Sequence, residues 1–334
     1  DFSYVEVPTG RGEFTWNDYN NDGIQQLNEF EVALFPDQAK FIRIFVPTNV
    51  FVKANYTTLN YSFSFNPKAV IKPGAKGLPG FLARLSWQTS LQKTKKSIAR
   101  GDVEFNPFKY GLQDTALLTL ATSLNNIVSF NRFSSRWGLD LSNLQNTGKA
   151  LLTYGYESRK LNDWQLKARW ILSPAFTFNV NTRRGTNNLF TPRFDNRNYA
   201  LRTWSVSPQI VFVNRSVFRV QAGFEWETRR NQPAFGGEHA TSGALNVESK
   251  YNVLQNASVT GRFTYNQIRY PFATNSTVSY VMLEGLLPGS NYLWGLDFTK
   301  RLFNNIELSL QYDGRRPAQA PTVHTGRASI RALF

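Results

Sequence analysis

Apolar and polar side chains alternate with a period of two along most of this chain, which is typical of β-strands with two different faces. From Trp164 to Leu172, for example, apolar residues take the even positions, and Lys167 and Arg169 take odd ones. The alternation predicts about fourteen antiparallel strands, at 57–66, 80–91, 115–124, 127–142, 148–159, 163–172, 175–185, 199–213, 216–229, 240–252, 257–269, 291–301, 305–313 and 323–334.

These segments run to about ten residues, whereas strands of soluble proteins most often have five or six. Aromatic residues gather near their ends, and the polar face mixes charges with Thr, Ser, Asn and Gln. These three features favour an all-β transmembrane antiparallel barrel, whose apolar face meets lipid and whose polar face lines a lumen. A soluble β-sandwich also alternates in this way and is the competing interpretation.

The lengths of the connections give the expected topology. Short turns are predicted at 173–174, 214–215, 254–256 and 302–304, and longer loops at about 184–199, 230–240 and 314–322. Barrels of the outer membrane alternate short periplasmic turns with longer outer loops. Residues 270–290 fit this rule as one long loop that includes the apolar stretch Tyr280–Pro288. The resulting even number of strands predicts that both barrel ends lie in the periplasm.

Residues 1–56 do not follow the alternation and contain an acidic stretch with Pro8, Pro36 and Pro47. We expect them to form a periplasmic lead-in or a plug inside the lumen, followed by the barrel at 57–334. No signal peptide opens the chain. Because Asp1–Val5 looks like the middle of a strand, Asp1 is expected to be the start of a fragment of a longer protein.

Composition narrows the choice of class. The chain of 334 residues is 41% hydrophobic and 15% aromatic, has no cysteine, and carries a net charge of +15. It contains no run of about 18 apolar residues, so its sequence excludes a transmembrane helix. The absence of cysteine excludes a disulfide framework and a thiolate metal site. The basic residues are scattered, and no nucleic-acid-binding motif accompanies them, so we expect no nucleic-acid partner.

One motif indicates a cation site. Residues 18–29 match the calcium-loop pattern D-x-[DN]-x-[DN]-G-x5-E. Calcium prefers six to eight oxygen ligands, and the predicted structural Ca²⁺ site uses the side chains of Asp18, Asn20, Asp22 and Glu29 and the carbonyl of Ile24. The alternative is a turn rich in Asp and Asn, whose side chains accept hydrogen bonds from their own backbone.

Catalytic signals are weak, and we expect no enzymatic activity. The chain has two histidines, His239 in a predicted outer loop and His324 at the start of the last strand. No nucleophile-elbow motif accompanies them. An outer-membrane hydrolase that uses His239 is the alternative.

Charged residues on the polar face are expected to line the lumen. Arginine and lysine outnumber acids among them, which favours anions if the lumen is open; pairing of opposite charges would instead indicate a plugged lumen. The predicted lumen-lining residues are Arg84, Lys167, Arg169, Arg183, Arg219, Glu225, Glu227, Arg262, Asp297, Glu307, Arg327 and Arg331.

Four stretches resemble the large outer-membrane barrels of Bacteroidota, in which the barrel is the C-terminal part of a longer protein. They are Gly10–Trp16 with Asp18–Phe30, Leu152–Arg159, Met282–Gly289 and the tail Gly326–Phe334. The tail also resembles the closing strand of bacterial outer-membrane barrels. The resemblance implies a location in the bacterial outer membrane, insertion by the barrel-assembly machinery, and membership of an assembly or secretion complex with other envelope proteins. Contact with lipopolysaccharide phosphates is expected instead from the scattered basic residues.

The first functional hypothesis is therefore a pore, or a membrane-embedded subunit of a transport, secretion or assembly complex. The alternatives are the hydrolase and a soluble, calcium-stabilised adhesin or glycan-binding β protein. The sequence names no cargo.

Overall fold

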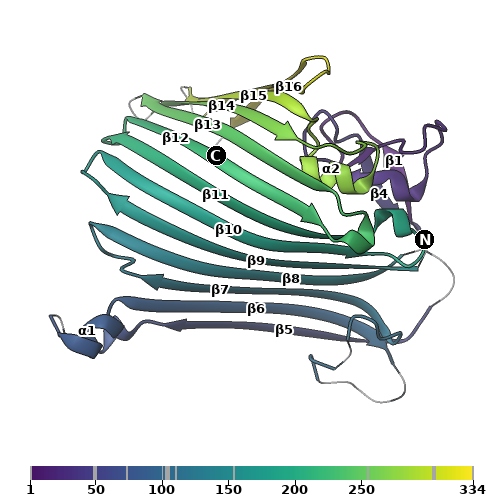
Figure 1. Cartoon of the computed structure of the whole chain (residues 1–334), viewed down its shortest axis with the longest axis horizontal. Helices are drawn as coiled ribbons and strands as arrows, with labels where there is room; N and C mark the ends of the chain where they lie inside the picture. Colours follow the sequence, from purple (N-terminus) through teal and green to yellow (C-terminus); the bar gives the residue numbers. More distant parts are fainter. Residues whose placement is uncertain are drawn as a thin grey trace.

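The structure is a computed structural model that describes residues 2–47, 51–72, 74–99, 101, 106–109, 111–152, 155–253, 256–302 and 306–332. It contains a small sheet near the N-terminus and a large curved sheet that makes up most of the molecule (Figure 1). The expected all-β antiparallel fold is confirmed.

Thirteen strands of the described chain form the large sheet, and each pairs with its neighbour in sequence. They are β5 (Ala54–Phe65), β6 (Leu85–Ile98), β7 (Leu117–Phe130), β8 (Trp137–Leu152), β9 (Gly155–Ile171), β10 (Phe176–Phe190), β11 (Tyr199–Asn214), β12 (Phe218–Asn231), β13 (His239–Val253), β14 (Ala257–Arg269), β15 (Gly289–Arg301), β16 (Ile306–Arg316) and β17 (Val323–Ala332). Strands β5 and β17 are the two edges, and no described residue pairs one edge with the other.

Residues 115–172 were expected to form four strands, but they form three longer ones, β7, β8 and β9. The described sheet therefore has an odd number of strands. Because neighbours are antiparallel, β5 begins at one end of the sheet and β17 finishes at the other. The prediction that both barrel ends lie on one side does not fit this topology.

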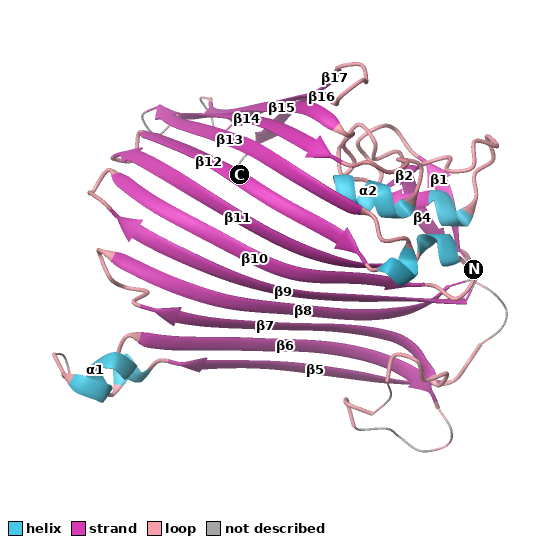
Figure 2. Ribbon diagram, viewed as in Figure 1, coloured by secondary structure: helices cyan, strands magenta, loops and turns pink. Residues whose placement is uncertain are grey.

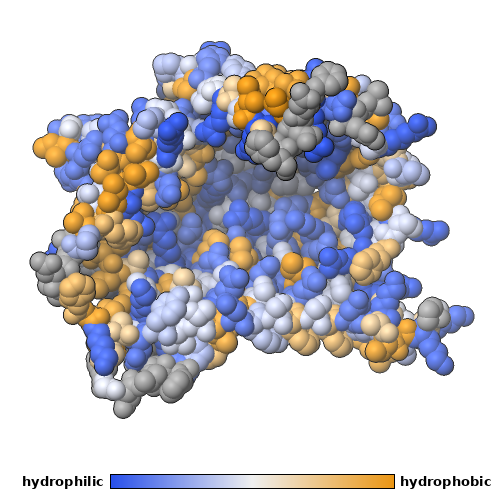
Figure 3. All heavy atoms as spheres, turned by 180° about the vertical axis from the view of Figure 1, so that it is seen from behind, coloured by the Kyte–Doolittle hydropathy of each residue, from blue (hydrophilic) through white to orange (hydrophobic). Residues whose placement is uncertain are grey.

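The two faces of the sheet differ in chemistry, as the alternation predicted. The convex face carries exposed aromatic and aliphatic side chains, which include Trp164, Trp204, Trp226 and Leu296. The concave face is polar. Figure 3 looks into this hollow, which is coloured mainly as hydrophilic residues. Among the described residues, no helix is long and apolar enough to cross a membrane.

The small sheet contains β1 (Phe2–Glu6), β2 (Phe14–Trp16), β3 (Phe30–Val32) and β4 (Phe41–Phe45), in the order β1-β4-β2-β3. Aromatic rings fill its core. The ring of Phe30 stacks on Tyr4 with a centroid distance of 4.0 Å and meets Phe41 edge-on at 5.1 Å.

The connections differ between the two ends of the large sheet (Figure 2). One end has the longer connections at 191–198, 232–238 and 270–288, which contain η3 (Asp195–Arg197), η4 (Pro233–Phe235) and α2 (Thr277–Leu283). We call this the long-loop end. The opposite end has mostly tight turns, with the exception of 66–84, which contains η2 (Pro67–Ala69) and α1 (Gly77–Leu82).

The small sheet lies at the long-loop end beside α2 (Figure 1). The apolar stretch Tyr280–Pro288, expected to be loop rather than a spanning strand, begins in α2 and continues into the turn before β15. Residues 2–47 and α2 together are called the roof below.

Candidate functional site

The roof is held against the concave face by an apolar cluster. Val278, Met282 and Leu283 of α2 are buried against Leu201 of β11 and Ile268 of β14. These two strand residues point to the concave side, because their immediate neighbours in sequence point to the convex one. Helix α2 begins with a capping box, in which the Ser276 side chain accepts a hydrogen bond from the amide of Ser279.

A buried polar network ties the small sheet to the large sheet, whose concave side with its connections at the long-loop end is called the wall below. Glu31 of β3 is 6% exposed. Its Oε1 accepts a hydrogen bond of 2.8 Å from Thr277 of α2, and its Oε2 lies 3.4 Å from Arg197 of η3. Arg197 also lies 3.7 Å from Glu157, which pairs with Arg159 at 2.7 Å. The network therefore joins the small sheet, α2, η3 and β9.

A second connection of this kind, or tie, joins the roof to β16. Arg315 of β16 forms a two-pronged ion pair with Asp37, and its Nε donates to Oδ1 at 3.1 Å. The Tyr280 hydroxyl donates to the Val32 carbonyl at 3.1 Å. Burial raises the pKa of Tyr280 to about 12, so this hydroxyl keeps its proton at neutral pH.

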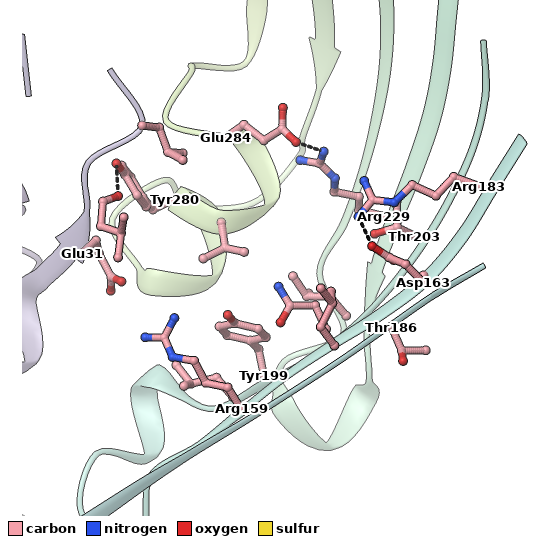
Figure 4. Close-up of a pocket in the computed structure, with 18 residues that line it drawn as sticks. Glu31, Arg159, Asp163, Arg183, Thr186, Tyr199, Thr203, Arg229, Tyr280 and Glu284 are labelled. Atoms are coloured by element: carbon pink, nitrogen blue, oxygen red, sulfur yellow. Dashed lines mark hydrogen bonds and ion pairs between the residues drawn. The ribbon is translucent and has the colours of Figure 1, made fainter. Parts of the chain in front are cut away.

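Between the roof and the wall lies a cavity of about 290 Å³ (Figure 4). Glu31, Leu34 and Tyr280 line it on the roof side, and Arg183 and Thr203 line it on the wall side. Arg183 pairs with Asp163 at 2.7 Å. Opposite charges thus pair across strands and between the roof and the wall.

Glycine makes the pairing of Asp163 possible. Gly185 of β10 lies directly opposite Asp163 in the register of β9 and β10. A Cβ at Gly185 would come within 2.1 Å of the Asp163 carboxylate. Without a side chain there, the carboxylate lies over the β10 backbone and reaches Arg183.

Eleven of the predicted lumen-lining residues lie in strands at concave positions of the register; Arg84 instead lies in the turn before β6. Several are already paired: Arg262 with Asp297 at 2.7 Å, and Glu227 with Arg229. Arg229 also forms an ion pair with Glu284, just after α2. The eleven, spread over the concave face, are Lys167, Arg169, Arg183, Arg219, Glu225, Glu227, Arg262, Asp297, Glu307, Arg327 and Arg331.

The structure brings together charged residues that sequence analysis did not select. These are Glu31, Asp37, Arg197 and Arg315 in the two ties, and Asp163 on the wall. Asp163 was detectable, because it begins the predicted strand 163–172 and takes the same odd-numbered polar positions as Lys167 and Arg169.

The predicted calcium loop forms a compact turn. Asp18 accepts backbone hydrogen bonds from Asp22 and Gly23, at 3.1 and 2.8 Å, and Asp22 accepts one from Ile24 at 2.7 Å. Glu29, expected to close the ligand shell, accepts a hydrogen bond from the Trp16 indole at 2.8 Å. Nowhere in the described chain do three His, Cys, Asp or Glu side chains gather as a metal site would require. The calcium site, with Asn20 as a further ligand, stays a prediction.

The two histidines lie in different surroundings. His239 begins β13 and meets the ring of Phe272 edge-on at 5.1 Å. His324 of β17 lies 2.8 Å from the Tyr312 hydroxyl through Nδ1. No described hydrogen bond joins either histidine to a serine.

The pKa of Glu31 gives a prediction about pH. Burial raises it above its ordinary value of 4.5, although Arg197, Thr277 and Arg159 counteract this effect. The attached roof therefore binds a proton more tightly than the released roof. Between pH 4.5 and the raised pKa, lowering the pH should favour attachment of the roof to the wall. Above the raised pKa, the attachment should no longer depend on pH through Glu31.

Hydrogen exchange of residues 2–47, corrected for intrinsic exchange rates, measures this attachment. Glu31→Gln should remove the pH dependence that Glu31 contributes. Protection that weakens as pH falls from 7 to 5 in the parent, but not in the variant, would contradict the sign.

No known protein family matches the chain, and no curated protein matches it. Three solved structures are similar in shape. The outer membrane channel DcaP of Acinetobacter baumannii has 8% identity and a TM-score of 0.42, over 74% of this chain and 83% of DcaP. A Pseudomonas aeruginosa FadL homologue has 11% identity and a TM-score of 0.41, over 99% of this chain and 85% of its own. OmpT, an outer membrane protein of Vibrio cholerae, has 6% identity and a TM-score of 0.31, over 79% of this chain and 86% of OmpT.

Proposed function

We propose that this protein is a bacterial outer-membrane β-barrel whose lumen is closed at the long-loop end by the roof, so that it acts as a gated pore. The main observation in support of a membrane location is that the acidic residues of the large sheet lie on its concave face and not on its convex face. Every acidic residue in β5–β17 lies at a concave position of the register: Asp140, Glu157, Asp163, Glu225, Glu227, Glu248, Asp297, Glu307 and Asp313.

The convex face has the layout of a membrane surface. Aromatic residues flank it at both ends, with Trp204 near the long-loop end of β11 and Phe212 near the other. Phe212 follows Trp204 by eight positions, or about 26 Å along the strand at 3.3 Å per residue, which corresponds to about 20 Å of membrane thickness at the strand tilt of about 40° usual in barrels. Outer-membrane barrels have an apolar band of about 25 Å between two aromatic girdles. Between them Ile210 is 43% exposed, which is favourable in hydrocarbon and costly in water.

The gate follows from the two ties. The pairs Asp37–Arg315 and Glu31–Arg197 connect the roof to β16 and to the connection between β10 and β11, and α2 adds an apolar contact with β11 and β14. A roof attached largely by a few ion pairs and one helix is suited to reversible release.

The sequence resemblance supports a finer proposal. The protein is the C-terminal barrel of a larger Bacteroidota-type protein, inserted by the barrel-assembly machinery and joined to other envelope proteins in a transport, secretion or assembly complex. Its role is passage or anchoring rather than catalysis.

Conductance in planar lipid bilayers tests the gate. We expect the parent to be mostly closed. Asp37→Arg places two arginines against each other, and loss of a largely buried pair costs about 3 kcal/mol, or roughly a hundredfold in the ratio of open to closed states. The swapped variant Asp37→Arg with Arg315→Asp restores the attraction and should return the low conductance.

A large steady conductance of the parent would contradict closure by the roof. If neither the parent nor Asp37→Arg conducts, gating is contradicted, and the protein is better described as a membrane-embedded subunit of a larger complex. Failure of the swapped variant to close the pore opened by Asp37→Arg would show that the pair does not hold the roof.

A further inference from the structure

Three arginines on the convex face lie at the aromatic girdle of the long-loop end, with Arg184 level with Trp204 and the other two just beyond it. Arg184 is on β10, Arg202 on β11 and Arg230 on β12, and all three are exposed. They occupy the same face as Trp204, because Arg184 lies directly opposite Trp204 and Arg202 is two positions before it. Arg230 lies directly opposite Arg202.

This arrangement is unfavourable without a counter-ion. Side chains directly opposite on antiparallel strands have Cβ atoms about 5 Å apart, and like charges there repel. No hydrogen bond or ion pair joins the guanidinium groups of Arg184, Arg202 or Arg230 to any described residue. Since the acidic residues of β5–β17 all lie at concave positions, the convex face offers these arginines no carboxylate.

The neighbouring residues suit a lipid headgroup. Trp204 and Trp226 meet edge-on at 5.2 Å on the membrane side of Arg202 and Arg230. Amphipathic rings of this kind lie at the level of the headgroups. Thr186, directly opposite Arg202, adds a hydroxyl on the same face. The basic surface extends along the same end of the convex face to Lys160, Arg269 and Arg316.

We propose that Arg184, Arg202 and Arg230 bind the phosphate groups of lipopolysaccharide in the outer leaflet. Arginine forks match phosphate oxygens in pairs, so the opposed Arg202 and Arg230 can hold one phosphate between them. Arg184, diagonal to Arg202 at about 7–8 Å, can reach the same phosphate or a second one. Longer connections mark the extracellular end of a barrel, and that side of the bacterial outer membrane carries lipopolysaccharide. The inference rests on the proposed membrane location.

The test uses the full chain inserted into phosphatidylcholine vesicles that contain lipopolysaccharide with intact lipid A phosphates. Bound lipopolysaccharide is measured after detergent extraction and repurification. Arg184→Gln with Arg202→Gln and Arg230→Gln should lower the affinity roughly a hundredfold, since each basic residue near an anionic lipid surface contributes about a fivefold effect. The matched control, Arg132→Gln with Arg136→Gln and Arg215→Gln, removes the same charge from exposed turns at the opposite end and should bind like the parent.

A second measurement uses only the parent protein, so that misfolding of a variant cannot explain its result. Dephosphorylated lipopolysaccharide should bind the parent about as weakly as intact lipopolysaccharide binds the triple variant. Equal binding of the intact and dephosphorylated forms, or unchanged binding by the triple variant, would overturn the proposal. Equally tight binding of phosphatidylglycerol would also overturn it and indicate general attraction to anionic lipid. Failure of the parent to insert into plain phosphatidylcholine vesicles would instead reject the membrane location itself.

Discussion

Replacement of Ile210 by arginine is expected to destabilise the inserted protein by about 1–3 kcal/mol, because Ile210 lies between the lipid-facing midplane, where arginine costs about 2–4 kcal/mol, and the interface, where it costs about 0–1 kcal/mol. Ile210 lies between Trp204 and Phe212 on β11, on the convex face, and is 43% exposed. In hydrocarbon the guanidinium would have no water and no acidic neighbour, because the acids of the adjacent strands point to the concave side. Urea-induced unfolding in vesicles, followed by the shift between folded and unfolded bands on a gel, measures the change.

The matched control differs by one position. Gln209 precedes Ile210 and points to the concave side, so Gln209→Arg places the same charge in the polar hollow. We expect it to change stability by less than about 1 kcal/mol. Equal effects of the two variants, or a parent that stays dissolved in plain buffer, would show that hydrocarbon does not cover the convex face and would revive the soluble sandwich.

The faces of the sheet were predictable from sequence because side chains of a strand alternate strictly. Lys167, Arg183 and Glu227 could be assigned to the polar side without knowledge of their neighbours. The prediction was weaker where a strand leaves the apolar band. In β8, the convex positions after Leu141 are Asn143, Gln145, Thr147 and Lys149, so both faces become polar and the alternation disappears. Strand β8 was therefore divided in two.

The ties of the roof could not be predicted from sequence. Glu31 and Arg197 are 166 positions apart, and Asp37 and Arg315 are 278 apart. No local period connects such residues, and each looks like an ordinary loop charge. Residues 1–56 were set apart because they break the alternation, but the alternation says nothing about their partners on α2, η3 and β16, which the curvature of the large sheet brings close.

Replacement of Phe30 by alanine is expected to release residues 2–47 of the roof while the large sheet remains folded. Phe30 is 4% exposed and lies between Tyr4 and Phe41, so its loss removes the centre of the small aromatic core. Phenylalanine-to-alanine changes in a core cost about 3–5 kcal/mol. Because a sheet of this size buries little apolar surface, such a cost should unfold most of residues 2–47.

Two measurements separate release of the roof from general unfolding. Limited proteolysis of Phe30→Ala should cleave within residues 2–47 while the large sheet stays resistant, and the conductance should rise as it does for Asp37→Arg. Phe45→Ala, at the 66% exposed end of β4, is the matched control and should change stability by less than about 1 kcal/mol. If Phe30→Ala leaves the pore closed while the roof is cleaved, the small sheet does not obstruct the lumen, and closure has to come from α2 and the wall. That outcome would keep the membrane barrel and reject the gate.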